Sequence, residues 1–168
     1  KGVINLKKVM VNFEKCLGCH TCELACATSH SKAKSFLGAV LGGETPPISV
    51  KVLADKTMCF PLQCRHCTDA HCIKACITHA LHRDEVSGAV ICDSQKCVGC
   101  WMCVMTCPLG AISEGLNHKA VKCDLCKETG VPACAASCPT GALTYEEIEE
   151  YDQGKKTDYI VNYLKGAM

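Results

Sequence analysis

The sequence contains few aromatic residues and no long apolar segment. Phe, Trp and Tyr make up 5 % of its 168 residues, so ordinary hydrophobic burial is thin for a chain of this length. No stretch approaches the roughly 18 consecutive apolar residues of a membrane-spanning helix, and Lys1 to Asn12 has neither the apolar core of a signal peptide nor a twin-arginine motif. We therefore expect a cytoplasmic protein without direct membrane insertion.

A strong charge of either sign is also absent. The formal net charge of +1 gives no electrostatic case for binding nucleic acid. The sequence lacks a glycine-rich dinucleotide turn, a phosphate-binding loop and a nucleophile with a base at a useful spacing. These absences favour a protein that is not an enzyme and has no nucleic-acid partner.

Cysteine, in contrast, is abundant. The chain has 18 cysteines, more than a structural core uses, so metal ligation has to supply part of the folding free energy. Cysteine-rich chains are either disulfide scaffolds of oxidising compartments or metal-binding proteins of reducing ones. Because the sequence shows no secretory signal, we expect reduced cysteines that bind metal.

Sixteen of these cysteines fall into four groups of four. The third group, Cys97 to Pro108, has the C-x2-C-x2-C-x3-C-P pattern of bacterial ferredoxins, in which three thiolates on one loop hold a 4Fe-4S cluster and the fourth reaches a second cluster. The first group keeps this spacing with Ala27 in place of proline. The second group has four residues, and the fourth group seven, between the second and third cysteines. In chain order the groups are Cys16, Cys19, Cys22 and Cys26; Cys64, Cys67, Cys72 and Cys76; Cys97, Cys100, Cys103 and Cys107; and Cys123, Cys126, Cys134 and Cys138.

The spacing of the groups discriminates between iron-sulfur clusters and zinc. Zinc sites usually combine two C-x2-C pairs across a longer loop, whereas the first and third groups each place four cysteines within eleven residues. The fourth group alone has a spacing that suits zinc, so a structural zinc-binding interaction module is the alternative. We expect four 4Fe-4S clusters bound through all sixteen thiolates.

The segments around the cysteine groups are repeated as well. Residues 108–112 and 139–143 match, and residues 77–81 match them with His79 in place of glycine. Short β-prone stretches occur at residues 9–11, 48–52, 89–91 and 120–121. The sequence therefore predicts an α+β fold in which a unit of strand, cysteine loop, short helix and strand occurs four times and forms two pseudo-symmetric, bacterial-ferredoxin-like halves.

Two segments fall outside these repeats. Residues 27–63 form an insertion that we expect to cover the clusters, with partner binding as the alternative. Residues 144–168 form a helical tail, in which Thr144 and Glu147 are a possible capping box and Gly154 separates two helical stretches. We expect this tail to pack on the body, and docking to another subunit is the alternative.

The four groups closely resemble those of the four-cluster ferredoxin subunits that serve dimethyl sulfoxide reductase, formate dehydrogenase and nitrate reductase. The resemblance covers residues 9–143 and implies two halves, residues 1–26 with 120–143, and residues 64–112. It also implies that the first and fourth groups share one pair of clusters and that the second and third groups share the other. The implied ligand sets are Cys16, Cys19, Cys22 and Cys138 (set 1); Cys64, Cys67, Cys72 and Cys107 (set 2); Cys97, Cys100, Cys103 and Cys76 (set 3); and Cys123, Cys126, Cys134 and Cys26 (set 4).

Within that family, two stretches are most similar to the iron-sulfur electron-transfer subunit of nickel-containing carbon monoxide dehydrogenase. They are ACATSHSKAKSFLGAV (25–40) and PLQCRHCTDAHC (61–72). This likeness implies a non-catalytic subunit that relays electrons one at a time from carbon monoxide dehydrogenase to a hydrogenase or another oxidoreductase. The subunits of formate dehydrogenase, formate hydrogenlyase or other molybdopterin oxidoreductases are the rival interpretation.

Several residues lie near the groups without belonging to them. Cys59 and Cys92 each precede a group by five residues, and we expect buried packing for both, with a redox-active thiol or a further ligand as the alternative. The histidines within cysteine loops are expected to donate hydrogen bonds rather than ligate iron, because each group already has four thiolates. They are His20, His66 and His71. Basic residues beside the cysteines are expected to be solvated surface charges. They are Lys15, Arg65, Lys74, Lys96 and Lys122.

Overall fold

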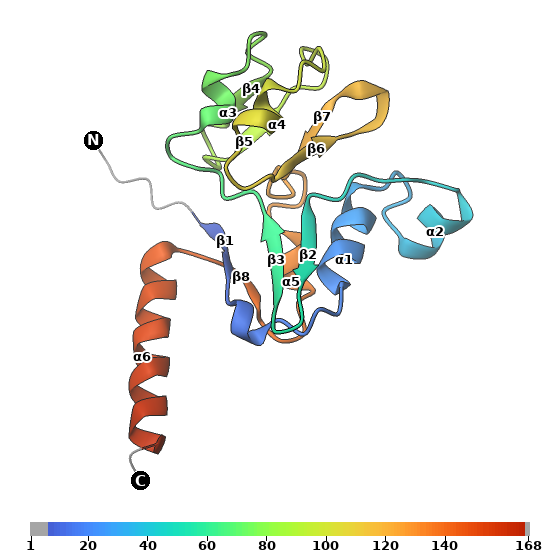
Figure 1. Ribbon diagram of the computed structural model, residues 1–168. Coiled ribbons are helices and arrows are strands. Elements are labelled where there is room, and N and C mark those ends of the chain that lie inside the picture. The colour runs from blue at the N-terminus through green and yellow to red at the C-terminus, as the bar shows by residue number, and fades with distance from the viewer. Residues whose placement is uncertain (1–6, 167–168) are drawn as a thin grey trace.

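The computed structural model of the chain describes residues 7–166 (Figure 1). In this part, eight short strands pair into four antiparallel ribbons: β1 with β8, β2 with β3, β4 with β5, and β6 with β7. The strands are β1 (Lys8–Val11), β2 (Val50–Ala54), β3 (Cys59–Gln63), β4 (Leu81–Arg83), β5 (Val90–Cys92), β6 (Ile112–Glu114), β7 (Ala120–Lys122) and β8 (Leu143–Glu146). Each predicted β-prone stretch contributes to a strand, although the second one begins only at Val50.

Four short helices each follow a cysteine loop and carry the third cysteine of its group. They are α1 (Thr21–His30), α3 (His71–Lys74), α4 (Met102–Thr106) and α5 (Ala133–Ala136). A strand precedes each loop, and a strand comes after each helix. The predicted unit of strand, cysteine loop, short helix and strand, and with it the α+β ferredoxin-like fold, is confirmed.

The strand pairing returns the end of the repeats to their beginning. β1 pairs with β8 in a register that sets Val9 opposite Tyr145, and helix α1 packs against α5 while α3 packs against α4. The buried residues form two cores. One core contains Val9, Cys22, Cys26, Val50, Ala89, Leu125, Cys134 and Leu143. The other contains Ala70, Ala80, Leu81, Val90, Cys97, Cys103, Ile112 and Ala120.

The ribbons β2–β3 and β6–β7 connect one core to the other. β2 follows the first cysteine group and pairs with β3, which precedes the second group; β6 and β7 link the third group to the fourth in the same way. In Figure 1 the elements α3, α4, β4 and β5 lie in the upper part, and β1, β8, α1 and α5 lie in the lower part.

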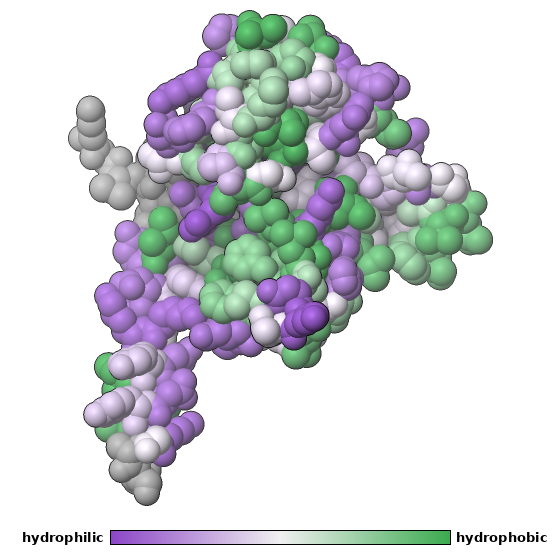
Figure 2. Space-filling model, viewed as in Figure 1, coloured by the Kyte–Doolittle hydropathy of each residue, from purple (hydrophilic) through white to green (hydrophobic). Residues whose placement is uncertain are grey.

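The segment between α1 and β2 forms a lateral protrusion. It contains α2 (Phe36–Leu41), where the Ser35 hydroxyl accepts a hydrogen bond from the Gly38 amide. The Glu44 carboxylate closes the loop by accepting the amides of Lys32 and Ala33 at 2.7 and 3.2 Å. Figure 2 shows apolar residues gathered on this protrusion; Phe36, Leu37, Val40 and Leu41 are exposed.

The tail differs from its prediction in three respects. Thr144 lies in β8 opposite Met10, so it is not the N-cap of a helix, because strand pairing with β1 determines its conformation. Residues 148–166 form one helix, α6 (Ile148–Gly166), which continues through Gly154. A single exposed glycine costs a helix only about 1 kcal/mol, and a Lys156–Asp152 ion pair spans this turn at 2.5 Å.

The third difference is that most of α6 does not pack on the body. Its first turns contact the body through Tyr151, whose hydroxyl donates to the Val11 carbonyl at 3.0 Å, and through Lys155, which lies 3.9 Å from Glu14. Beyond these turns the helix projects away (Figure 1), and Tyr159 and Leu164 are 72 % and 58 % exposed. The prediction of a packed tail is wrong for this part, because the contacts of α6 with the body that hold it end near Lys155. Among residues 7–166, no helix is long and apolar enough to cross a bilayer.

Candidate metal centre

Four cysteines from opposite ends of the chain line one small cavity. Cys16, Cys19 and Cys22 come from the loop before α1 and its first turn, and Cys138 comes from the end of α5. The pKa of the Cys22 thiol is raised to about 11, mainly by burial, and the charge of the nearby Cys138 makes a small contribution to this shift. The β1–β8 ribbon causes this meeting, because it brings the last repeat beside the first.

A second cavity has an equivalent lining. Cys97, Cys100 and Cys103 come from the third group, and Cys76 comes from the end of the second. Cys92 lines the same cavity. Burial, followed by the charges of Cys97 and Cys103, raises the pKa of Cys92 to about 12.

The other two sets are recognised by their mutual electrostatic influence. Burial raises the pKa of Cys72, and the thiolates of Cys64 and Cys107 add to this effect. Burial also raises the pKa of Cys134 to about 12, with Cys26 and Cys126 as the strongest charged neighbours. Two cavities therefore combine cysteines of two groups, and Cys72 and Cys134 each have a cysteine of another group, Cys107 and Cys26, among their charged neighbours.

Backbone amides point at several of the sulfur atoms. The amides of Ser49, Leu125 and Ala133 donate to the Sγ atoms of Cys26, Cys123 and Cys126 at 3.4 Å. The Ala120 amide donates to Cys97 Sγ at 3.5 Å. Amide donors stabilise thiolates and are characteristic of iron-sulfur sites. The chemistry of this donor set therefore fits 4Fe-4S clusters, whose binding displaces the thiol protons.

The cysteine loops depend on left-handed backbone conformations. The residue before the second cysteine of each group has a positive φ: Gly18 (67°), His66 (46°), Gly99 (70°) and Leu125 (59°). His79 has a φ of 52°, where the matching positions of the other repeats hold Gly110 and Gly141. A non-glycine residue reaches this conformation at a cost of about 1–2 kcal/mol, so His66, His79 and Leu125 retain the loop geometry despite their side chains.

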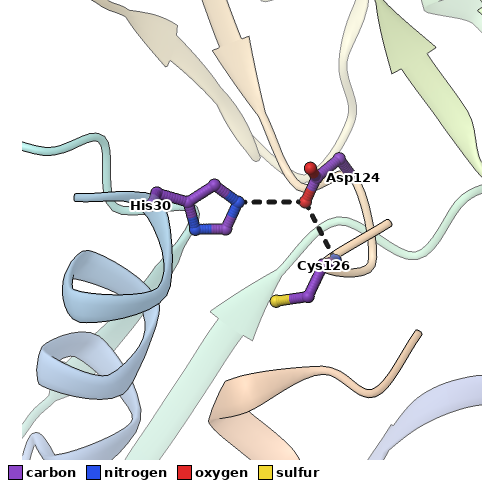
Figure 3. A group of neighbouring side chains, drawn as sticks. All are labelled: His30, Asp124 and Cys126. Atoms are coloured by element: carbon purple, nitrogen blue, oxygen red, sulfur yellow. Dashed lines mark hydrogen bonds and ion pairs between the residues drawn. The ribbon is translucent and has the colours of Figure 1, made fainter. Parts of the chain in front are cut away.

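A polar bridge that the sequence did not reveal joins α1 to the fourth group (Figure 3). His30 Nε2 lies 3.1 Å from Asp124 Oδ1, and the same carboxylate oxygen accepts the Cys126 amide at 2.9 Å. The pKa of His30 is raised to about 11, first by the hydrogen bond to Asp124 and second by the hydrogen bond to Cys26. The ligand atoms of His30, Asp124 and Cys126 lie within 4.8 Å of one another and could hold a metal ion, but Cys126 also belongs to the fourth cysteine group. An aspartate inside a C-x2-C turn was the signal available in the sequence.

Lys122 is buried, contrary to the expectation of a solvated charge. It is 8 % exposed, and its ammonium group donates to the carbonyls of Val90 and Cys123. Lys74 and Lys96 are exposed as expected and pair with Asp69 and Asp93. Cys59 packs against the backbone of Gly18 in the first cysteine loop. The functional roles of Cys59 and Cys92 stay predictions.

Comparison with known proteins identifies this arrangement. A family model described as a 4Fe-4S dicluster domain matches residues 55–148, which contain the second, third and fourth cysteine groups. The chain belongs to the 4Fe-4S dicluster domain family. The first cysteine group lies outside the matched residues.

Three relatives of the chain are named as iron-sulfur or electron-transport proteins. The chain is 40 % identical over 105 residues to the "Iron-sulfur protein" of Rhodospirillum rubrum. The aligned residues cover 62 % of this chain and 54 % of that protein. The chain is 36 % identical to the electron transport protein HydN of Escherichia coli K12, covering 62 % and 57 %. It is 34 % identical to the arsenate respiratory reductase iron-sulfur subunit ArrB of Shewanella sp. ANA-3, covering 62 % and 43 %. The chain thus spans about half the length of these relatives.

A distant likeness to a solved structure covers nearly the whole chain. One chain of the benzoyl coenzyme A reductase active-site complex BamBC, solved with benzoyl-CoA bound, is 21 % identical to this chain with a TM-score of 0.48. The alignment covers 95 % of this chain and 97 % of that one.

Two glycines of the third repeat test the loop geometry. Gly99 and Gly110 have φ values of 70° and 60°, but a Cβ on Gly99 would overlap the His118 carbonyl oxygen, whereas a Cβ on Gly110 meets nothing within 4 Å. We expect Gly99→Ala to lose about four iron atoms per chain, one cluster's worth, because the loop has to move. Gly110→Ala is the matched control and retains its iron. Iron and sulfide analysis after anaerobic reconstitution measures both variants, and equal losses would show that backbone strain, not the collision, is the cause.

Proposed function

We propose that the chain carries four 4Fe-4S clusters and relays electrons one at a time between two redox proteins. The observation that carries this proposal is that two cavities are each lined by three cysteines of one group and one cysteine of another. A bound 4Fe-4S cluster takes up and gives up a single electron at a potential set by its surroundings. The chain supplies the thiolates, the amide donors and the burial that determine this potential.

The proposed ligand sets are those implied by the nested pairing of groups. The cavity lined by Cys16, Cys19, Cys22 and Cys138 supports set 1, and the cavity that contains Cys76 and the third group supports set 3. The electrostatic neighbours of Cys72 and Cys134 support sets 2 and 4. We also propose the two halves, residues 1–26 with 120–143 and residues 64–112. The α1–α5 and α3–α4 contacts support this division. The two cores follow it in most of their members, although Ala89 belongs to the first core and Ala120 to the second.

The neighbours of the sets support a linear order of 1, 4, 2 and 3. Cys22 of set 1 influences Cys134 of set 4, and Cys64 of set 2 influences Cys123 of set 4. Sets 2 and 3 are connected by the contact of α3 with α4. Cys19 and Cys100, in the two outer sets, are exposed, whereas Cys126 in set 4 is buried. Set 2 also reaches the surface through Cys67. Electrons can thus enter at one end of the row and leave at the other.

Carbon monoxide dehydrogenase is the proposed donor, and a hydrogenase or another oxidoreductase is the proposed acceptor. The likeness of residues 25–40 and 61–72 to the corresponding electron-transfer subunit supports this choice. The names of HydN and ArrB support electron transport and service to a reductase in general, so an electron-transfer role in a formate dehydrogenase, formate hydrogenlyase or other molybdopterin enzyme is the second candidate. The exposed apolar residues of α2 and α6 offer surfaces on which such partners could dock.

Metal analysis tests the number and type of centres. Anaerobically reconstituted protein is expected to hold about sixteen iron and sixteen sulfide per chain, because each cluster contains four of each. Iron that stays near eight after full reconstitution would reduce the proposal to a two-cluster protein. A colourless protein with bound zinc and no sulfide would establish the zinc-binding module instead.

The crossed ligand pairing is tested by comparing three serine variants. Cys107 lies on the third loop but is proposed to complete the set of Cys64, Cys67 and Cys72. We therefore expect Cys107→Ser and Cys72→Ser to change the same electron paramagnetic resonance signal in a redox titration, whereas Cys103→Ser changes a different one. If Cys107→Ser instead reproduces the spectrum of Cys103→Ser, the pairing is wrong.

The donor is tested by following reduction of the oxidised protein through the loss of its visible absorbance. We expect catalytic amounts of nickel-containing carbon monoxide dehydrogenase, supplied with carbon monoxide, to reduce the protein at least about ten times faster than formate dehydrogenase supplied with formate. The reason is that surfaces of complementary charge raise association rates by about tenfold or more. Dithionite gives the full amplitude as a control. Faster reduction with formate would favour the second candidate.

A further inference from the structure

His66 occupies a position where a histidine needs an explanation. It lies between Cys64 and Cys67, it is only 4 % exposed, and its φ of 46° is left-handed. The first and third groups have Gly18 and Gly99 at this position, which adopt that conformation without strain. The chain therefore bears both backbone strain and the burial of a polar ring at this point.

The hydrogen bonding of the ring fixes its tautomer. His66 Nδ1 accepts a hydrogen bond from the Val90 amide at 2.9 Å, so Nδ1 carries no proton and the proton of the neutral ring is on Nε2. Nε2 is buried and has no hydrogen-bond partner within the described part of the protein. A buried N–H without an acceptor is costly, so this donor indicates a group that the polypeptide itself does not supply.

The charged neighbours of His66 do not provide the acceptor. Lys8, Arg83 and Lys122 are cations and can only donate. Asp124 also influences the ring, but neither of its carboxylate oxygens is in hydrogen-bond contact with Nε2. Lys122 and Asp124 flank Cys123, and Cys123 is an electrostatic neighbour of Cys64. His66 therefore lies where the second and fourth cysteine groups meet.

We propose that His66 donates its Nε2–H to a sulfur atom of a 4Fe-4S cluster at this junction and thereby raises the reduction potential of that cluster. The acceptor is an inorganic sulfide of the cluster in set 2 or set 4, because no cysteine sulfur of the described residues bonds to Nε2, and both sets lie in the middle of the proposed row. Donation to a cluster sulfur stabilises the reduced form, which carries the additional negative charge. This role of His66 rests on the proposed function, because it requires a bound cluster.

Two amide substitutions separate the two nitrogens of the ring. Asn places a carbonyl near the position of Nδ1, so His66→Asn keeps the acceptor for the Val90 amide, tolerates a positive φ and removes the Nε2 donor. Gln extends its amide to the position of Nε2, so His66→Gln keeps a donor there. His71, which is exposed in the same cysteine loop, provides the control variant His71→Asn.

The measurement is a redox titration of reconstituted protein, monitored by electron paramagnetic resonance. We expect His66→Asn to lower one potential by about 59 mV, a tenfold change for a one-electron couple, and we expect His66→Gln and His71→Asn to retain it. Comparison with the signals that Cys72→Ser and Cys134→Ser remove assigns the shifted couple to set 2 or set 4. Unchanged potentials in a fully loaded His66→Asn protein would overturn the proposal.

If the His66→Asn variant takes up its clusters poorly, a spectroscopic measurement on the protein without that substitution still tests whether His66 bonds to a cluster. Protein labelled with 15N-histidine is expected to show a nitrogen coupling to one reduced cluster in electron-nuclear double resonance, and His66→Gln removes that coupling. Absence of any histidine coupling in the labelled protein overturns the role of His66. Absence of iron after reconstitution is a different result, since it refutes the four-cluster function itself.

Discussion

The structure depends on one geometric requirement: cysteines that lie far apart in the sequence have to line the same space. Three cysteines of one loop and one of a distant group line each of two cavities, with Cys138 beside the first loop and Cys76 beside the third. The ribbons serve this requirement. The β1–β8 pairing brings the last repeat to the first, and the β4–β5 ribbon brings the second group to the third.

Electrostatics imposes a second requirement on the same arrangement. A 4Fe-4S cluster with four thiolates carries a charge of about −2, so the four clusters of the proposed function would change the formal charge from +1 to about −7. Amide donors to Cys26, Cys97, Cys123 and Cys126 offset part of this charge locally. Buried Lys122 places a full positive charge beside Cys123, where the two cores meet. Its burial is understandable if the surroundings are strongly negative.

The two segments outside the repeats behave differently from the body because no cysteine set fixes them. α2 is anchored by Glu44 and Ser35 but exposes its apolar side chains. α6 is attached through Tyr151 and then continues without a surface to cover. α6, with 19 residues, is long enough to form from local sequence, whereas the six-residue α2 depends on its Ser35 cap and on the Glu44 contacts of its loop.

The sequence by itself determined the four cysteine groups, the repeated unit and the approximate positions of β1, β2, β5 and β7, because ligand spacing and short β-prone stretches are local properties. It did not predict β3, which forms by pairing with β2. It could not reveal the His30–Asp124 bridge, whose partners are 94 residues apart, or the burial of Lys122 and His66, which depends on where β5 passes. Thr144 shows the reverse effect: a plausible local cap was overridden by pairing with Met10. Only the tertiary structure decided these features, because each requires groups that the chain brings together after it has folded back on itself.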